Sequence, residues 1–212
     1  MWAPASETWK AQGEFLPASD EDGGGRWVFA EPVPREGWPL KWNAVRFTAQ
    51  TTPFRHLGFF PDMAPVWSWM REQKSVEAAR ANAALSGMGD APVRWIIDDA
   101  AKFVAREVRR NRRYDGILLD PPKYGRGPEG EVWRLEEDLP RLLADCRRLL
   151  DADSRFLFLT VYAVRMSALA LQELMRQLFA DLPGKVEAGE LGVREEARGL
   201  TLPTAIWARW SR

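Results

Sequence analysis

Apolar residues along the second half of this chain follow two patterns. The run Gly116 to Leu119 is apolar at every position, which is typical of a strand covered on both faces of a parallel α/β sheet. Phe156 to Val161 has the same character. Between such runs leucine and alanine recur at helical spacing, and the predicted helices span Ala100 to Arg110, Leu135 to Leu150 and Ser167 to Leu182. Strand and helix alternate, so the pattern predicts an α/β fold with a mostly parallel sheet.

Further elements are expected on both sides of this series. Val93 to Ile97 is predicted to be a strand ahead of the first helix. Val186 to Glu195 and Leu202 to Trp210 are predicted to pair as an antiparallel hairpin around Gly199, at the edge of the sheet. Val66 to Ser86 contains neither Gly nor Pro, and its apolar spacing suits one long helix or two joined end to end, stopped by the glycine that follows.

The N-terminal part of the chain differs in composition. From Met1 to about Pro39 there are five prolines, a run of three glycines and an acidic stretch, so little regular structure is expected. Lys41 to Thr51 alternates and predicts one or two strands. We therefore expect a loop-rich segment with some β-structure over 1–61 and an α/β domain over 62–212. The tryptophans of the first part either anchor its loops, the interpretation we prefer, or form a base-stacking platform: Trp2, Trp9, Trp27, Trp38 and Trp42.

The composition excludes several classes of protein. Hydrophobic residues make up 46% and charged residues 28%, as in a globular enzyme, and no apolar run approaches the length of a bilayer span. Lys plus Arg and Asp plus Glu are 30 each, so an RNA partner would have to be held by a local basic patch. With one His and one Cys, neither a metal site nor a disulfide is expected. The N-terminus lacks a basic segment followed by an apolar one, so we expect a cytoplasmic protein without membrane contact.

The loop after Gly116 to Leu119 is the strongest candidate for chemistry. Asp120 follows the apolar run directly, and Pro121 and Pro122 prevent further ladder bonding. An acid at the carboxyl end of a parallel strand lies where open α/β sheets bind ligands. Because prolines donate no backbone hydrogen bond, the carboxylate and carbonyl groups here offer only acceptors, which suits a planar amine or amide. The alternative is a capped turn, since Asp and Pro are common turn residues.

Three segments, in this order along the chain, carry a resemblance to a known family. They are TPFRHLGFFPD from Thr52, IIDDAAKF from Ile96 and LDPPKYGRG from Leu119. Together they resemble class I S-adenosylmethionine-dependent methyltransferases, and among these the ribosomal-RNA type that acts on the large subunit. The likeness runs from about Phe47 to Trp210. It implies a Rossmann-like sheet, S-adenosyl-L-methionine as the cofactor, and RNA, in particular ribosomal RNA, as the partner in an rRNA-processing reaction.

The resemblance also implies which residues act on the target. Asp120, Pro121, Pro122 and Lys123 match the motif that faces the substrate, and they are the predicted catalytic residues. In the commonest amino-methyltransferases an aromatic residue directly follows the second proline, whereas Lys123 intervenes here. For the substrate itself we expect a flipped base to stack on Tyr124. Arg126 and Arg134 are expected to contact the RNA.

On the cofactor side the resemblance assigns fewer residues. Asp99 matches the acid that accepts the adenine amino group, and Asp98 beside it could cap the next helix. The alternative is that both only cap. Phe59 is a candidate wall of the cofactor site, and the alternative for it is a place in the core. For His56, the single imidazole, an orienting or structural role is expected.

One part of the family pattern is missing. Such a fold should open with a strand, a glycine-rich turn and a helix that meet the methionine end of the cofactor, followed by an acid for the ribose. Here the two helical segments Trp67 to Gln73 and Lys74 to Leu85 follow each other directly. Either the first strands were deleted or the chain omits a segment of the natural protein. The alternative function is therefore a methyltransferase-like RNA-binding or interaction module that has lost its cofactor site.

Two further patterns bear on the chemistry. Cytosine-C5 methylation needs a thiolate, and in related RNA enzymes it follows the strand equivalent to Phe156 to Val161, where this chain has no cysteine. Transfer to a nitrogen or oxygen is expected instead. The basic run Arg106 to Arg113 is either a solvated helix end or an RNA-backbone patch, and the first interpretation is preferred because the run should lie at the end of the sheet opposite the site.

Overall fold

The computed structural model describes most of the chain in two compact units. The described residues are 6, 8, 10–18, 24–42, 45–52, 57, 82–94, 96, 98–126, 131–162 and 164–212. One unit comprises Met1–Ile97 with Glu196–Arg198, and the other comprises Asp98–Glu195 with Gly199–Arg212. The boundary expected near residue 61 stays a prediction. Phe59, His56 and most of the helical stretch 66–86 lie outside the described residues.

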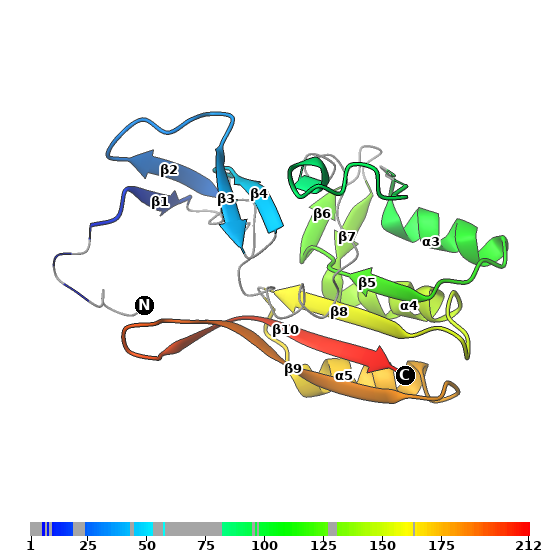
Figure 1. Ribbon diagram of the computed structural model, residues 1–212. Coiled ribbons are helices and arrows are strands. Elements are labelled where there is room, and N and C mark those ends of the chain that lie inside the picture. Colours follow the sequence, from blue (N-terminus) through cyan, green and yellow to red (C-terminus); the bar gives the residue numbers. More distant parts are fainter. Residues whose placement is uncertain are drawn as a thin grey trace. The chain divides into compact units, whose positions relative to one another are not determined.

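The first unit contains two antiparallel strand pairs (Figure 1). β1 (Gly13–Pro17) pairs with β2 (Gly25–Phe29), and β3 (Trp38–Trp42) pairs with β4 (Val45–Ala49). The expectation of little regular structure before Pro39 is therefore wrong for β1 and β2. Cross-strand aromatic packing explains this hairpin, because the Trp27 ring lies 5.5 Å from that of Phe15 across the pair. The Trp27 indole N–H also donates to the Thr52 carbonyl at 3.1 Å, which is the anchoring role that we preferred.

The end of the long predicted helix falls within the described residues. Residues 82–85 are helical, and Gly87 adopts the left-handed conformation, with φ of 71°, that commonly ends a helix. The Met88 N–H donates to the Ala83 carbonyl at 2.8 Å and closes the last turn. The Asn82 side chain accepts from the Thr48 N–H at 3.3 Å, so this helix end is tied to β4.

The second unit is built on one mixed four-stranded sheet, which confirms the α/β class. Its strand order is β5 (Gly116–Leu119), β8 (Phe156–Tyr162), β10 (Thr201–Ser211) and β9 (Lys185–Arg194). β5 and β8 are parallel, and the other two neighbouring pairs are antiparallel, so the described sheet is mixed and not mostly parallel as expected. The hairpin between β9 and β10 turns through Gly199, whose φ of 70° favours glycine.

Two strand predictions need correction. Val93, Arg94 and Ile96, the described residues of the expected strand 93–97, lie outside any strand. The Val93 N–H donates to the Ala91 carbonyl at 2.7 Å in a tight turn, so it cannot join a ladder. In the part of the chain that the structure describes, β5 therefore has β8 as its one neighbour, and its residues are partly exposed and not covered on both faces.

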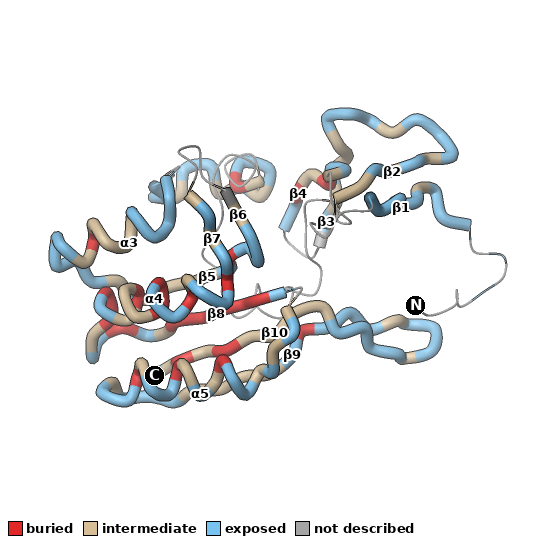
Figure 2. The backbone as a smooth tube through the Cα atoms, turned by 180° about the vertical axis from the view of Figure 1, so that it is seen from behind, coloured by how far each residue is buried: buried red, intermediate tan, exposed pale blue. Residues whose placement is uncertain are grey.

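The described residues of the second unit also form the helices α3 (Ala100–Arg109), α4 (Leu135–Arg147) and α5 (Ala168–Leu178). Their predicted positions are confirmed, with α4 and α5 ending a few residues early. Buried residues gather along β8, β10, α4 and α5 (Figure 2). Leucines of α4 and Met175 of α5 pack against Leu157, Leu159 and Val161 of β8. No helix among the described residues is long and apolar enough to cross a bilayer.

Candidate functional site

Asp120 is held by a buried threonine of the neighbouring strand. Leu119 pairs with Leu159 at the carboxyl end of β5, which puts Asp120 level with Thr160 of β8. The Thr160 hydroxyl donates to Asp120 Oδ1 at 2.5 Å, and Thr160 is only 2% exposed. A hydrogen bond to an ionised carboxylate is among the stronger ones in proteins, so it limits rotation of the Asp120 side chain. The one signal for this contact in the sequence is a lone hydroxyl in the apolar run FLFLTV.

Two hydrogen bonds to backbone carbonyl groups hold the rest of the loop. The Trp133 indole N–H donates to the Pro122 carbonyl at 2.6 Å, and the Leu135 N–H donates to the Lys123 carbonyl at 3.0 Å. Pro121 is buried. Sequence analysis missed Trp133, because nothing local marks a tryptophan as a partner of a proline eleven residues earlier. The loop is therefore held from three directions, by β8, by β7 (Val132–Arg134) and by the start of α4.

Tyr162 also belongs to this site and was missed as a site residue. Successive side chains of a strand point to opposite faces, so Tyr162 lies on the same face of β8 as Thr160. The pKa of the Tyr162 hydroxyl is raised above 10.0, first by burial and second by the negative charge of Asp120. The phenol therefore stays protonated close to the Asp120 carboxylate.

A short antiparallel ribbon follows the loop directly. β6 (Tyr124–Arg126) pairs with β7 (Val132–Arg134), with Tyr124 opposite Arg134 and Gly125 opposite Trp133. Directly opposite residues of such a pair project to the same face, so the structure brings together the predicted substrate residues Tyr124 and Arg134. Trp133 is on the other face, where it reaches the loop. The Arg126 backbone pairs with that of Val132, and the Arg126 side chain is not among those that the structure describes.

Asp98 and Asp99 lie at the start of α3. Because α3 runs antiparallel to β5, its first turn is at the same end of the unit as Asp120 (Figure 1). The helix cap is Asp99, whose Oδ1 accepts from the Lys102 N–H at 2.7 Å. The prediction that Asp98 caps is wrong, because its carboxylate pairs with Arg106. The Lys102 ammonium bonds to Glu131 at 2.5 Å, which ties this turn to the residue preceding β7.

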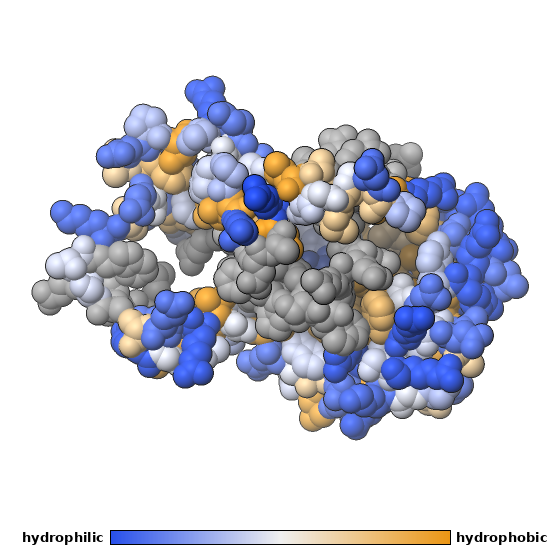
Figure 3. Space-filling view, in the orientation of Figure 1, coloured by the Kyte–Doolittle hydropathy of each residue, from blue (hydrophilic) through white to orange (hydrophobic). Residues whose placement is uncertain are grey.

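Some arginines of the basic run pair with nearby carboxylates. Arg106 pairs with Asp98, and Arg110 lies 3.0 Å from Glu107. The Tyr114 hydroxyl also donates to Glu107 at 2.7 Å, and this bond, followed by Arg110, lowers the pKa of the Glu107 carboxyl below 4.5. Hydrophilic side chains gather over the outer end of α3 (Figure 3). These contacts fit the solvated helix end that we preferred.

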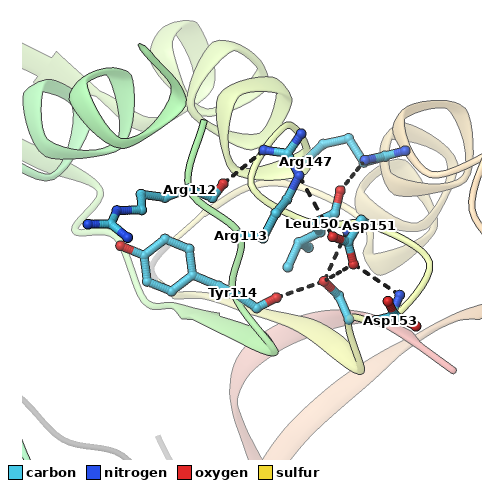
Figure 4. Close-up of polar contacts among 8 residues, drawn as sticks. Arg112, Arg113, Tyr114, Arg147, Leu150, Asp151 and Asp153 are labelled. Atoms are coloured by element: carbon cyan, nitrogen blue, oxygen red, sulfur yellow. Dashed lines mark hydrogen bonds and ion pairs between the residues drawn. The ribbon is translucent and has the colours of Figure 1, made fainter. Parts of the chain in front are cut away.

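A cavity of about 440 Å³ lies beside this run, at the amino ends of β5 and β8. Its lining includes Arg113, Arg147 and Asp151 (Figure 4). The Arg113 guanidinium lies 3.8 Å from Asp151 and donates to the Arg112 carbonyl, and Arg147 donates to the Leu150 carbonyl at 2.9 Å. Arg147 also forms two bonds to the Asp181 carboxylate. The cations of this cavity therefore have partners within the protein, and it lies at the opposite end of β5 from Asp120.

Within the described ranges there is no cluster of three His, Cys, Asp or Glu residues that could hold a metal ion. The one cysteine, Cys146, is 1% exposed in α4, and burial raises the pKa of its thiol to about 12. It is therefore a core residue and not a nucleophile.

Comparison with known proteins assigns the chain to a family. No protein-family model and no curated protein matches it significantly. The crystal structure of a SAM-dependent methyltransferase from Agrobacterium tumefaciens is similar, with a TM-score of 0.85 and 33% identity over 100% of this chain and 81% of that chain. A SAM-dependent methyltransferase structure from Streptococcus mutans has the same fold, with a TM-score of 0.61, 12% identity and coverage of 88% of this chain and 58% of that chain.

The Agrobacterium match spans all the elements described above, including the strand that precedes Asp120 and the helix capped by Asp99. An identity of one third over the whole length, together with the same fold, is more than a shared architecture. The chain belongs to the SAM-dependent methyltransferases.

Proposed function

We propose that this methyltransferase modifies RNA, and specifically ribosomal RNA, by transferring the methyl group to a nitrogen or an oxygen. The observation that carries the proposal is the loop from Asp120 to Lys123, which is held rigidly at the carboxyl end of β5 by Thr160 and Trp133. A fixed carboxylate and a proline carbonyl are acceptors that can orient an amino or amide group of a base. Tyr124, Arg126 and Arg134, the proposed RNA contacts, follow immediately in the chain.

The cofactor, S-adenosylmethionine, supplies an electrophilic methyl group on a sulfonium. Asp99 fits the proposed role toward its adenine. Capping uses Oδ1 alone, and a carboxylate has further acceptor positions for an exocyclic amine. Asp98 contributes through its ion pair with Arg106, which holds the start of α3. Among the described residues ahead of α3, Gly87 and Gly89 follow a helix and not a strand, so they do not supply the glycine-rich turn for the methionine end.

The element to which the methyl group is transferred is inferred from the cysteine content of the chain. A C5 mechanism needs a cysteine thiolate that adds to the ring. The chain has one cysteine, and Cys146 is buried with a pKa of about 12. The last three residues of β8 are Thr160, Val161 and Tyr162, and the Thr160 hydroxyl donates to Asp120. Transfer to an electron pair of nitrogen or oxygen needs only alignment with the sulfonium methyl group.

The test is methyl transfer from tritiated S-adenosylmethionine to ribosomal RNA, followed by mass spectrometry of the nucleosides. We expect N- or O-methylated nucleosides with the wild-type protein and a strong loss of label with Asp120→Ala. Label recovered in a 5-methylpyrimidine would contradict the proposed chemistry. Label in protein and none in RNA would contradict the proposed substrate.

The second candidate function is a binding module without a cofactor site, which the missing glycine-rich turn favours. Calorimetric titration with S-adenosylhomocysteine separates the two. The enzyme should bind this product, and Asp99→Ser should weaken binding without unfolding α3, because serine is also a good helix cap but is too short to reach the adenine. No heat of binding with the folded wild-type protein would favour the module.

A further inference from the structure

We propose that the β6–β7 ribbon binds unpaired RNA next to the target nucleotide, with Tyr124 stacking on a base and Arg134 binding a phosphate. This inference rests on the proposed function, and it deepens it by naming the single-stranded state of the substrate. It also assigns to Trp133 the role of connecting the RNA-binding face to the loop that holds the target.

The strand register creates one exposed face on the ribbon. Tyr124 and Arg134 are direct cross-strand partners, and Val132 lies on the same face, two residues before Arg134. Tyr124 is 41% exposed, Val132 is 42% exposed, and the Arg134 side chain is 57% exposed. An aromatic ring, an apolar side chain and a guanidinium therefore stand side by side on a surface open to solvent.

The opposite face of the ribbon is attached to the catalytic loop. Trp133 lies on that face, and its indole N–H donates to the Pro122 carbonyl at 2.6 Å. A two-stranded pair of this length is not stable alone, so the anchor determines where the exposed face lies. Tyr124 is four residues after Asp120, so their Cα atoms are at most about 14 Å apart. A base stacked on Tyr124 is thus a near neighbour of the base held at Asp120.

A phosphate that binds Arg134 would replace only a weak surface ion pair. Among the described residues Arg134 has one ion-pair partner, Glu137 at 3.6 Å, and both side chains are more than half exposed. Such a surface pair contributes little free energy, so a phosphate can replace the carboxylate at small cost. Lys123, which is also exposed, adds a second positive charge beside Tyr124.

This combination fits unpaired RNA better than duplex RNA. Single-stranded nucleic acid is recognised by aromatic rings that stack on accessible bases, together with positive charge that follows the backbone. In a duplex the bases are stacked on one another, and recognition relies on a broad surface that matches the helix shape. The net charge of this chain is zero, so it offers no general field for a duplex, and the narrow ribbon offers a local site.

The experiment measures fluorescence anisotropy of a labelled unpaired RNA and of a hairpin that contains the same strand. We expect the wild-type protein to prefer the unpaired RNA. Tyr124→Leu should lower that affinity about tenfold, whereas Tyr124→Phe should retain it, because only the aromatic face is needed. Arg134→Gln should weaken binding and reduce the dependence on salt concentration by about one counterion.

The matched control is Arg176→Gln in α5. Arg176 is similarly exposed and has the same i,i+3 pairing with a glutamate, Glu173, at 2.8 Å, but it is remote in sequence from the ribbon. It should bind both RNAs as the wild type does. Trp133→Phe keeps an aromatic ring but removes the donor that anchors the ribbon, so it should weaken binding of the unpaired RNA and also lower the methyl-transfer rate.

Equal affinity for hairpin and unpaired RNA, or wild-type affinity in both Tyr124→Leu and Arg134→Gln, would overturn the inference. If ribosomal RNA still accepts the labelled methyl group under those outcomes, the proposed function stands without the inference about the ribbon. If S-adenosylhomocysteine binds but RNA is neither bound nor labelled, the proposed function itself fails, and the inference fails with it.

Discussion

Thr160 is a buried side chain that orients Asp120 through a hydrogen bond. It comes from a strand forty residues further along the chain, and its hydroxyl is shielded from water. Asp120 has the neighbouring Tyr162 phenol as a second polar group. Positioning of the carboxylate, and not its mere presence, is therefore the property that the fold supplies.

We predict that Thr160→Val will lower the methyl-transfer rate while the Michaelis constant for RNA changes little. Valine has the same shape but lacks the donor, so Asp120 can rotate, and the free energy of unfolding should fall by about 1 kcal/mol. Thr160→Ser retains a hydroxyl and should restore most of the rate. Single-turnover kinetics and urea unfolding measure the two effects. A wild-type rate in Thr160→Val would show that Thr160 has no positioning role.

The contact between α3 and the segment that leads into β5 has a dependence on pH. Glu107 of α3 accepts from the Tyr114 hydroxyl, and the pKa of Glu107 is lowered by this bond and by Arg110. A carboxyl group whose pKa is lower in the folded than in the unfolded state stabilises the protein at pH values above its unfolded pKa, here 4.5. This contribution is lost as the pH falls through the folded pKa.

We therefore predict that Tyr114→Phe will destabilise the protein at neutral pH and that the difference from wild type will shrink well below pH 4.5. Urea unfolding of both proteins at the two pH values measures this, with Glu107→Gln as the variant that removes the titrating group. A difference between Tyr114→Phe and wild type that is the same at both pH values would show that the Glu107 charge does not contribute.

The core of the second unit is closed around its one thiol. Cys146 is buried among leucines of α4 and residues of β8 and β10, and its pKa of about 12 leaves it almost entirely protonated at neutral pH. Because a thiol reacts as the thiolate, modification requires this core to open.

We predict that a disulfide reagent such as DTNB will leave the native protein unmodified and will label one thiol in denaturant. Labelling as a function of urea concentration should follow the unfolding curve measured by circular dichroism. Complete reaction in the absence of denaturant would contradict the closed core, and Cys146→Ala provides the blank.

The sequence was sufficient for the features that depend on neighbouring residues. The apolar period placed the strand at Gly116 and the helices that follow, because amphipathic faces involve residues a few positions apart. The start of α3 was also placed within one residue, although the cap is Asp99 and not Asp98. The Asp-Pro-Pro loop was also recognisable, since prolines end a strand wherever they occur. Each of these patterns is local, so no knowledge of the strand order was required.

The three-dimensional fold was needed for contacts between distant residues. The bond from Thr160 to Asp120, the clamp from Trp133 to Pro122 and the pairing of Tyr124 with Arg134 each depend on strand order or register, which the sequence pattern leaves open. The hairpin of β1 and β2 was missed for the same reason, because packing between Phe15 and Trp27 overrides a composition typical of loops. Local patterns thus placed the loop that carries the chemistry, and long-range packing provided the residues that hold it in position.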